Sequence, residues 1–463
     1  MADPAAALER FSPPVREWFT ATFRAPTPPQ TEGWPAIADG DHTLILAPTG
    51  TGKTLSAFLW ALDRLAVEPL PDDERARTRV LYLSPLRALA VDIEKNLRAP
   101  LQGIGFAADR TGDTVHTPTV GIRTGDTSTQ DRRRLVRHPP DILITPPESL
   151  FLMLTSPARQ TLANGQHVII DEIHAMAGTK RGAHLLLSLE RLEELTERPP
   201  QRIALSATPR PLDEIARFLG GATVVDDGAV TLRPVTVVDA GAKKELDIEV
   251  VVPIDDMGAL GERVEPPIDG PAVASPMRRS IWPSIHPRLL ELVEEHRSTL
   301  IFSNARRLAE RLATRLNELS LEARHGDDDE PVAPPPVLIG VSDEQVGRGA
   351  GEGEELVKAH HGSLSRERRL QIEDELKRGD LKGLVATSSL ELGIDMGAVD
   401  LVVQVASPGS VASGMQRIGR AGHQVGQPSR GKIFPKHRAD LLEAAVVVDR
   451  MHHGLIEETR YPR

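Results

Sequence analysis

The stretch "HTLILAPTGTGKT" at residues 42–54 decides the fold. It begins with consecutive apolar residues, turns through Gly50 and Gly52, and ends in Lys53 and Thr54. A short run that is apolar on successive residues is typical of a strand buried on both faces, and such strands occur in parallel sheets covered by helices. Glycines after the strand let backbone N–H groups turn toward an anion where a helix begins. The stretch therefore predicts a strand–loop–helix unit of α/β type.

The loop within it, "APTGTGKT", has the spacing of a phosphate-binding P-loop. We expect Lys53 to meet the β- and γ-phosphates of a nucleotide and Thr54 to bind Mg²⁺. The strict pattern begins with glycine, where this chain has Ala47. A glycine-bearing turn that holds no ligand is therefore the plain alternative. The expected phosphate cradle consists of Thr49, Gly50, Thr51 and Gly52.

Similar apolar runs recur along the chain, including "RVLYLS", "DILITP", "HVIIDE", "RIALSA", "STLIFS" and "LVVQVA". Helical segments lie between many of them, which predicts a doubly wound α/β architecture. The runs pause from residue 228 to 287, where the proline-rich "VEPPIDGPAVASP" lies. We expect one domain over 1–233, a connection over 234–290 and a second domain over 291–463.

Charge and composition limit the partners. The net charge is −11, but residues 326–355 hold nine acidic residues and one arginine, so the rest of the chain is near −3. Overall charge therefore does not exclude a nucleic-acid partner, and the acidic stretch reads as a surface insertion. Aromatic residues are only 3%, which favours contacts to a phosphate backbone over base stacking.

Cellular location is limited by what the sequence lacks. The chain has no cysteine, which excludes disulfides and thiolate metal sites. It also shows no export signal and no apolar run of the ~18 residues that a membrane span needs. We therefore expect a monomeric cytoplasmic protein.

Polar residues follow five of the strands, at the edge where open α/β sheets bind ligands. They are Ser84, Thr145, Asp171, Ser206 and Thr387. Two carboxylates meet at one strand end, in "VIIDEIH" at residues 168–174. We expect Asp171 to hold Mg²⁺ through water and Glu172 to deprotonate the attacking water. A solvated turn is the alternative for such a pair.

The segment "QRIGRAGH" at residues 416–423 places two arginines on short spacing. If a second α/β domain faces the nucleotide, Arg417 and Arg420 can act as arginine fingers on the γ-phosphate. A surface ion-pair network is the alternative.

Taken in order, these motifs resemble a known family. The set is "PTPPQ", "APTGTGKT", "DEIH", "SAT", "SSLELGID" and "QRIGRAGH", supported by "SPLRAL", "TPPESL" and "HHGSLSRERR". It resembles the two RecA-like domains of superfamily-two DEAD/DEAH helicases and, among them, the large helicase-related (Lhr) family. The resemblance covers nearly the whole chain except the acidic insertion, and relatives continue beyond it into a winged-helix domain. The chain therefore resembles the N-terminal part of such a protein.

The resemblance implies roles for further residues. Gln30 would read the adenine edge, and Asp395 would contact the ribose. Gln416 belongs to the catalytic motif, and His423 stands where many relatives have another arginine, so Arg420 is the first choice for the finger. Ser206 and Thr208 would couple hydrolysis to movement. The residues expected to contact nucleic acid are Arg87, Thr145, Arg279 and Thr387.

The function implied is an ATP- and Mg²⁺-dependent DNA helicase. It would be stimulated by single-stranded DNA, track 3′ to 5′ and serve DNA repair. An RNA helicase is one alternative, and a nucleotide-gated binding fragment without unwinding is another.

The basic stretch "QDRRRLVRH" at 130–138 is better interpreted as a solvated helix face than as a contact to the nucleic-acid strand. His360 and His361 lack the acidic or cysteine companions of a metal site in the local sequence.

Overall fold

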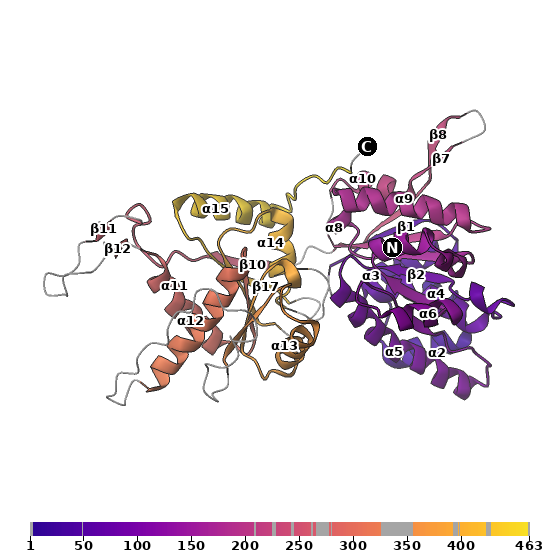
Figure 1. Cartoon of the computed structure of the whole chain (residues 1–463), viewed down its shortest axis with the longest axis horizontal. Helices are drawn as coiled ribbons and strands as arrows, with labels where there is room; N and C mark the ends of the chain where they lie inside the picture. Colours follow the sequence, from indigo (N-terminus) through magenta and orange to yellow (C-terminus); the bar gives the residue numbers. More distant parts are fainter. Residues whose placement is uncertain are drawn as a thin grey trace. The chain divides into compact units, whose positions relative to one another are not determined.

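A computed structural model describes residues 3–48, 50–207, 210–224, 228–241, 245–260, 263–264, 277–278, 280–325, 355–391, 397, 399–422 and 427–461. The chain divides into two compact units (Figure 1). Unit 1 holds the described residues up to 241 together with 456–461, and unit 2 holds those from 245 to 455. No helix in these ranges is long and apolar enough to cross a membrane.

Unit 1 is built on a sheet in which every neighbouring pair of strands is parallel. The strand order is β3-β4-β2-β5-β6-β1-β9. The strands are β1 (Thr43–Leu46), β2 (Val80–Leu83), β3 (Val120–Ile122), β4 (Ile142–Thr145), β5 (His167–Ile170), β6 (Gln201–Ser206) and β9 (Thr236–Asp239). Because all run the same way, the polar residues that follow them share one edge of the sheet.

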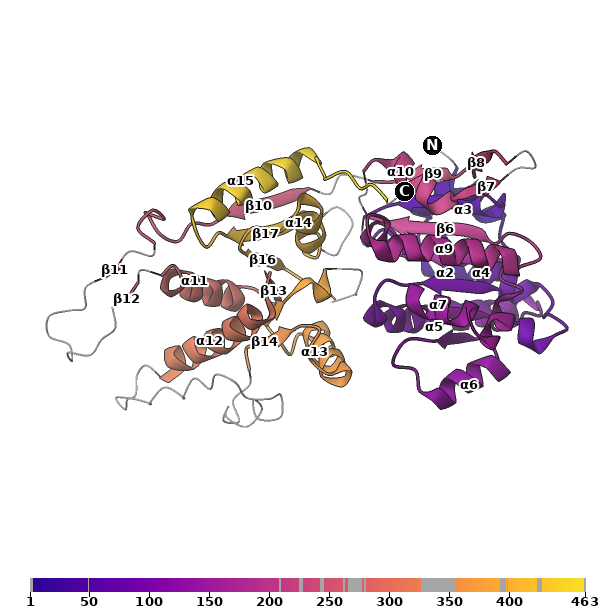
Figure 2. The same cartoon turned by 45° about the horizontal axis from the view of Figure 1, so that its top comes forward.

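Helices cover both faces of this sheet, as Figure 2 shows. Successive strand residues point to opposite faces, so Ile45 packs in one core cluster while Leu44 and Leu46 pack in the other. One face receives α1 (Pro4–Glu9), α2 (Pro13–Thr22), α3 (Pro28–Ala38), α4 (Lys53–Val67) and α5 (Arg87–Thr111). The other receives α7 (Pro147–Leu154), η2 (Pro157–Leu162), α8 (His174–Ala177), α9 (Lys180–Leu195) and α10 (Leu212–Gly220). The apolar runs of the sequence are thus buried on both faces.

Smaller elements complete unit 1. They are η1 (Glu74–Ala76), α6 (Thr129–Arg137) and an antiparallel hairpin of β7 (Ala222–Val224) and β8 (Val230–Leu232). The end of the chain returns to this unit, where the Thr459 N–H donates to the Arg210 carbonyl (2.6 Å) and Tyr461 packs against Phe218.

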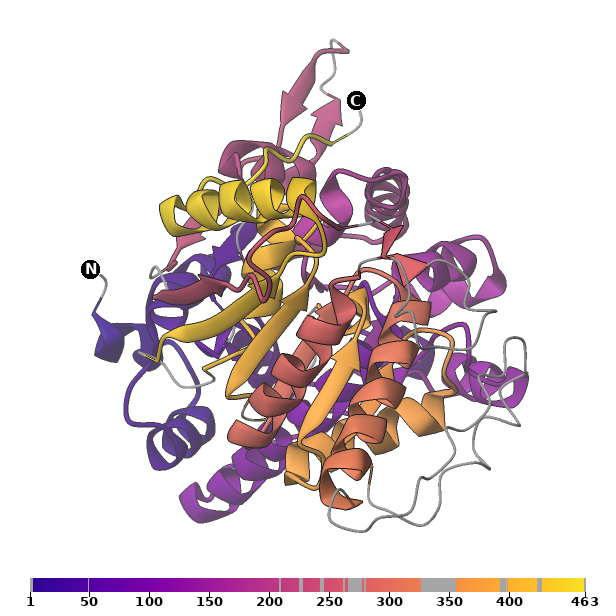
Figure 3. The ribbon, with the colours of Figure 1, turned by 90° about the vertical axis from the view of Figure 1, so that its left-hand side faces the viewer.

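Unit 2 repeats the plan with the strand order β10-β17-β16-β13-β15-β14, again parallel throughout. Helices α11 and α12 share a core cluster with one face of the sheet, while α14 packs beside β16 and β17 and α15 beside β10 (Figure 3). The strands are β10 (Leu246–Val250), β13 (Thr299–Ser303), β14 (Val357–His360), β15 (Gly383–Ala386), β16 (Leu401–Val405) and β17 (Ser429–Phe434). The helices are α11 (Trp282–Glu295), α12 (Arg306–His325), α13 (Arg366–Arg378), α14 (Val411–Ile418) and α15 (Arg438–His453), with the short turn η4 (Ser388–Leu390). A short pair, β11 (Arg263–Val264) and β12 (Met277–Arg278), lies outside this sheet.

Two parallel α/β sheets confirm the predicted fold class. The stretch expected as a separate connection, 234–290, is instead divided between the units. β9 extends the sheet of unit 1, whereas β10 forms the edge of the second sheet and α11 enters the second core. Val238 of β9 is buried in a core cluster of unit 1, and Ile285 and Leu289 of α11 are buried in the core cluster of unit 2, whereas the apolar residues of β10 are half-buried. Residues 326–354 of the expected acidic insertion lie outside the described residues.

Candidate functional site

The P-loop follows β1 at the carboxyl edge of the first sheet. Gly50 and Gly52 both take left-handed backbone angles (φ 81° and 77°), which explains why glycine stands at these positions. A Cβ at Gly52 would lie 2.7 Å from Gln30 Nε2, so a larger residue there would also displace the end of the Gln30 side chain. α4 begins at Lys53, directly after the loop, which aims the helix N-terminus at the same place.

Gln30 lies beneath this loop and is buried. Its Oε1 accepts a hydrogen bond from the Thr27 N–H (2.9 Å), closing the capping box at the start of α3. Its Nε2 lies 3.5 Å from the Gly52 carbonyl oxygen. The residue expected to read an adenine edge thus also joins the start of α3 to the P-loop.

Asp171 and Glu172 follow β5 at the same edge, and both are buried. Asp171 accepts hydrogen bonds from the Tyr82 hydroxyl and from the Glu172 N–H. Glu172 has a positive φ of 46°, which is uncommon for a residue with a side chain. Strained backbone of this kind clusters at functional sites, where the surrounding structure maintains it.

Burial and like charge define the electrostatics of this pair. Burial, and then the neighbouring Glu172 carboxylate, raise the pKa of Asp171 to about 6. Lys53 opposes this shift, and its Nζ lies 3.5 Å from Glu172 Oε1. Burial, followed by the charge of Asp171, also raises the pKa of Tyr82 well above its ordinary value, so Tyr82 remains a donor. Two adjacent buried carboxylates of this kind favour a cation beside them.

His174 extends the network in a way that the sequence reasoning missed. Its Nδ1 lies 3.5 Å from Glu172 Oε2 and 2.9 Å from the Ser206 hydroxyl at the end of β6. The histidine therefore lies between the expected base and the first residue of "SAT". Its place in "DEIH", two residues after Glu172, was the available signal.

The donor set fits a magnesium ion that arrives with a nucleotide. The described ranges contain no group of three or more His, Asp or Glu side chains that could hold a metal ion by themselves. Thr54 and Asp171 offer one hydroxyl and one carboxylate, and such hard oxygen ligands suit Mg²⁺, which usually keeps waters and phosphate oxygens as further ligands.

Farther along the same edge, Thr145 is fully buried at the end of β4, and its hydroxyl donates to the Arg123 carbonyl (2.7 Å). The side chain expected to contact nucleic acid thus supports the turn after β3. Arg132 on α6 donates to the Gly125 carbonyl in that turn (2.9 Å). Burial, and then the charge of Arg132, lower the pKa of Arg123. The sequence analysis did not identify Arg123 and interpreted Arg132 as part of a solvated helix face. Residues 124–131 separate the two arginines, and the sequence alone does not show that the fold brings them close together.

Unit 2 carries the two arginines of "QRIGRAGH", both buried. Arg417 donates from Nε and Nη2 to Glu391 Oε2 (3.2 and 3.0 Å) and from Nη1 to Asn304 and Gln404 (2.9 Å each). Arg420 donates from Nη2 to the Glu391 backbone carbonyl (2.9 Å). The two arginines thus share Glu391, which Arg417 contacts at the carboxylate and Arg420 at the backbone carbonyl.

The remaining predicted residues are only partly covered. Gln416 is half-buried on α14, and the Thr387 N–H donates to the His360 carbonyl (3.3 Å). The backbone of Arg87 begins α5, but its side chain is outside the described part. Five other predicted residues lie outside it entirely: Thr49, Thr208, Arg279, Asp395 and His423.

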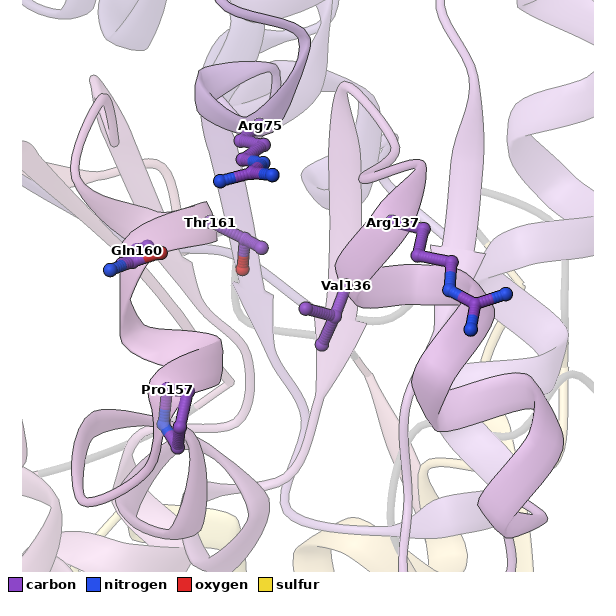
Figure 4. Close-up of a pocket in the computed structure, with 6 residues that line it drawn as sticks. All are labelled: Arg75, Val136, Arg137, Pro157, Gln160 and Thr161. Carbon is purple, nitrogen blue, oxygen red and sulfur yellow. The ribbon is translucent and has the colours of Figure 1, made fainter.

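A cavity of about 260 Å³ lies elsewhere in unit 1, between η1, η2 and the end of α6 (Figure 4). These elements precede β2, β5 and β4, so the cavity is at the amino edge of the sheet, opposite the P-loop. In the close-up, Thr161 and Val136 point into it, whereas the Arg137 guanidinium points away. It is separate from the candidate site.

Comparisons with known proteins agree with this geometry. Residues 27–215 match the DEAD/DEAH box helicase family, and residues 350–424 match the helicase conserved C-terminal domain. The chain is 53% identical over 464 residues to "Lhr helicase/ probable uracil glycosylase" of Mycolicibacterium smegmatis, covering 100% of this chain and 29% of that protein. It is 39% identical to "ATP-dependent helicase Lhr-Core" of Methanocaldococcus jannaschii, covering 97% of this chain and 46% of that protein.

The chain belongs to the Lhr helicases. A solved structure of the Mycobacterium smegmatis helicase Lhr bound to ssDNA and AMP-PNP is 52% identical, with a TM-score of 0.81. That match covers 98% of this chain and 52% of the solved one, and it confirms that the two sheets are RecA-like. The chain therefore spans about half or less of the Lhr proteins it matches.

Proposed function

We propose that this chain is the ATP-hydrolysing part of a helicase that moves along single-stranded DNA. The observation that carries the proposal is the buried group of Lys53, Asp171 and Glu172 at the end of a P-loop strand, joined through His174 to Ser206. A group that only shaped a turn would have no need to bury two adjacent carboxylates, which costs free energy unless a cation or ligand compensates it.

In this proposal, the P-loop holds the phosphates of ATP. Gly50 and Gly52 let backbone N–H groups face them, and the helix N-terminus at Lys53 adds positive potential. Lys53 lies near the γ-phosphate, where its ammonium neutralises negative charge. Magnesium, held by Thr54 and by Asp171 through water, supplies further positive charge at the phosphates. Gln30 supports the loop from below and selects adenine.

Glu172 is the proposed base for the attacking water. Lys53 on one side and His174 on the other hold its two carboxylate oxygens, so the side chain is oriented before ATP binds. The raised pKa of Asp171 belongs to the site without ATP, and added positive charge would lower it. His174 contacts both Glu172 and Ser206, so a movement of Glu172 can be transmitted to Ser206. This connection supports the proposed coupling role of Ser206 and Thr208.

Unit 2 supplies the second half of the proposed reaction. Arg420 is the arginine finger, and Arg417 positions it through the shared Glu391. Gln416 assists from the same motif, His423 is a weaker phosphate contact, and Asp395 binds the ribose. These roles rest on the positions of the residues in the family motifs.

The nucleic-acid strand is proposed to run along polar residues of both units, with phosphate contacts from Arg87, Arg279 and Thr387. Thr145 supports this path by holding the turn that begins at Arg123, and Arg123 and Arg132 add positive charge there. Contacts of this kind grip the backbone without reading bases. The solved Lhr relative bound to ssDNA supports DNA as the strand. We further propose 3′-to-5′ movement, a role in DNA repair and a monomeric state, as the family resemblance of the motifs implies.

The test is steady-state ATP turnover with no nucleic acid, with single-stranded DNA and with single-stranded RNA of the same sequence. We expect DNA to raise turnover several-fold, with an effect that weakens steeply as salt increases, because phosphate contacts release counterions. A Lys53→Ala variant is the blank. Stronger stimulation by RNA would reassign the substrate to RNA. Equal turnover under all three conditions would contradict a strand-driven motor and leave a nucleotide-gated binding module.

A further inference from the structure

The two histidines that open "HHGSLSRERR" have acidic neighbours that the local sequence does not reveal. His360 ends β14 and is buried at 1% exposure. Its Nε2 lies 3.0 Å from Glu373 Oε1 on α13, and its Nδ1 lies 3.1 Å from the Ser389 hydroxyl in η4. Glu373 lies thirteen residues away, across the turn into α13, so this hydrogen-bonded pair could not be seen in the local sequence.

The two ring nitrogens of His360 have different hydrogen-bonding roles, one as donor and the other as acceptor. A carboxylate accepts hydrogen bonds, so the nitrogen facing Glu373 carries hydrogen, and in neutral imidazole the other nitrogen accepts. Nδ1 can then accept the Ser389 O–H at 3.1 Å, a shorter contact than the one from the same hydroxyl to the His360 backbone carbonyl (3.4 Å). Glu373 is itself 6% exposed, so its contact with His360 is shielded from water, whereas Ser389 is half-buried.

The backbone of His360 also contacts the turn at residues 387–390, which contains η4. Its carbonyl accepts from the Thr387 N–H (3.3 Å), and β14 pairs with β15 so that His360 lies opposite Ala386. Thr387 is therefore attached on both sides, by its own N–H and, two residues later, by Ser389. Thr387 is 9% exposed and caps the start of η4.

We infer that His360 is a positioning residue for strand binding, which fixes the turn at 387–390 so that Thr387 can contact a phosphate of the bound strand. Glu373 orients the imidazole, and Ser389 transmits its position to the turn. The inference rests on the proposed function, because Thr387 matters here as a strand contact.

His361 provides a matched control beside it. Its Nε2 lies 3.0 Å from Glu310 Oε1, whose side chain on α12 is 56% exposed. This pair connects β14 to α12 and does not include the 387–390 turn. A change at His361 should therefore disturb the same strand end without loosening Thr387.

The experiment compares His360→Gln with His360→Asn in this chain. A glutamine amide can take the place of Nε2 and keep Glu373, but it removes the side-chain acceptor of Ser389, whose hydroxyl keeps only the longer contact to the backbone carbonyl of residue 360 (3.4 Å). An asparagine amide takes the place of Nδ1 and keeps Ser389. We measure the single-stranded DNA concentration that gives half-maximal ATPase activation, the KM for ATP, and hydrogen exchange at 387–390 without DNA.

We expect His360→Gln and Ser389→Ala to raise the half-activating DNA concentration about fivefold, the size of one lost hydrogen bond. His360→Asn and the control His361→Asn should change it by less than about twofold, and the KM for ATP should stay nearly constant in all four. In a Thr387→Ala background, His360→Gln should add little, because the two changes remove one interaction.

Full additivity with Thr387→Ala would overturn the inference, and so would an equal loss in His361→Asn. Hydrogen exchange separates this failure from failure of the proposed function. If DNA does not stimulate the parent chain, the strand role is lost together with the proposed function. Unchanged exchange at 387–390 in His360→Gln would instead show that His360 does not hold the turn.

Discussion

Each unit contains a pair of like-charged residues among its candidate functional residues, but the two pairs are held differently. In unit 1, Asp171 is anchored by Tyr82 and a backbone N–H, while Glu172 reaches Lys53 and His174. In unit 2, Arg417 directs all three side-chain nitrogens to side-chain oxygens, while Arg420 donates to a backbone carbonyl.

This contrast teaches that neighbouring residues of one motif need not share a role. Several side chains hold Arg417, so moving it would break contacts to Gln404 on β16, to Asn304 directly after β13 and to Glu391 directly after η4. Arg420 donates to the Glu391 backbone carbonyl, so its removal leaves the Arg417–Glu391 ion pair intact. We therefore assign chemistry to Glu172 and Arg420, and structure to Tyr82 and Arg417. The predictions below test that division.

The largest effect is expected for Arg420→Ala. Loss of an arginine finger typically lowers kcat by about 10³–10⁵. We expect ATP affinity, measured with a non-hydrolysable analogue, to change little, because the P-loop remains. A collapse of nucleotide binding with kcat preserved would place Arg420 in binding and contradict the assignment.

Glu172→Gln should come next. Removing a general base typically costs about 10²–10⁴ in rate, and the glutamine keeps the size of the side chain. Single-turnover cleavage of bound ATP measures this loss directly. Asp171→Asn is the companion variant, and it should weaken the Mg²⁺ dependence of turnover, whereas Glu172→Gln should leave that dependence unchanged.

Arg417→Ala should act mainly on stability. Removing one partner of a buried ion pair typically costs about 3–5 kcal/mol, because Glu391 is left with an uncompensated charge. Urea unfolding of the variant would measure the loss. Arg420→Ala is the comparison variant, and its loss should be smaller, because it leaves the Arg417–Glu391 ion pair in place. Equal losses in the two variants would remove the distinction between the arginines.

The smallest effect concerns pH. The pKa of Asp171 is raised to about 6 in the protein without ATP, so the carboxylate is protonated below that pH and cannot hold the magnesium shell. We expect kcat/KM for ATP to rise with pH through an apparent pKa near 6, a value that belongs to the Asp171–Glu172 pair. Tyr82→Phe removes a hydrogen bond that lowers this pKa, so the rise should move to higher pH. A profile that is identical in Tyr82→Phe would exclude Asp171 as the titrating group.

Much of the fold could be predicted because it depends on local pattern. Consecutive apolar residues such as those of β1 indicate a strand buried on both faces, and the glycines before Lys53 are required by backbone angles. The sequence did not show that β9 and β10 join different sheets, because each is a short strand whose partner is distant in the chain.

The site divides in the same way. Asp171, Glu172 and Lys53 stand in contiguous motifs, so their residue types and spacing revealed them. His174 was overlooked although it stands in the same motif, because its partner Ser206 comes from another strand. Glu373 and Arg123 were missed for a related reason, since only the packed fold brings them to His360 and toward Arg132.

The most direct test of the central claim is single-turnover ATP cleavage by the unmodified chain, with and without single-stranded DNA. The account predicts that DNA accelerates cleavage several-fold and that Arg420→Ala abolishes the acceleration while ATP stays bound. If cleavage proceeds at the same rate with and without DNA, or if Arg420→Ala responds to DNA as the parent does, the proposed DNA-driven ATP hydrolysis is contradicted.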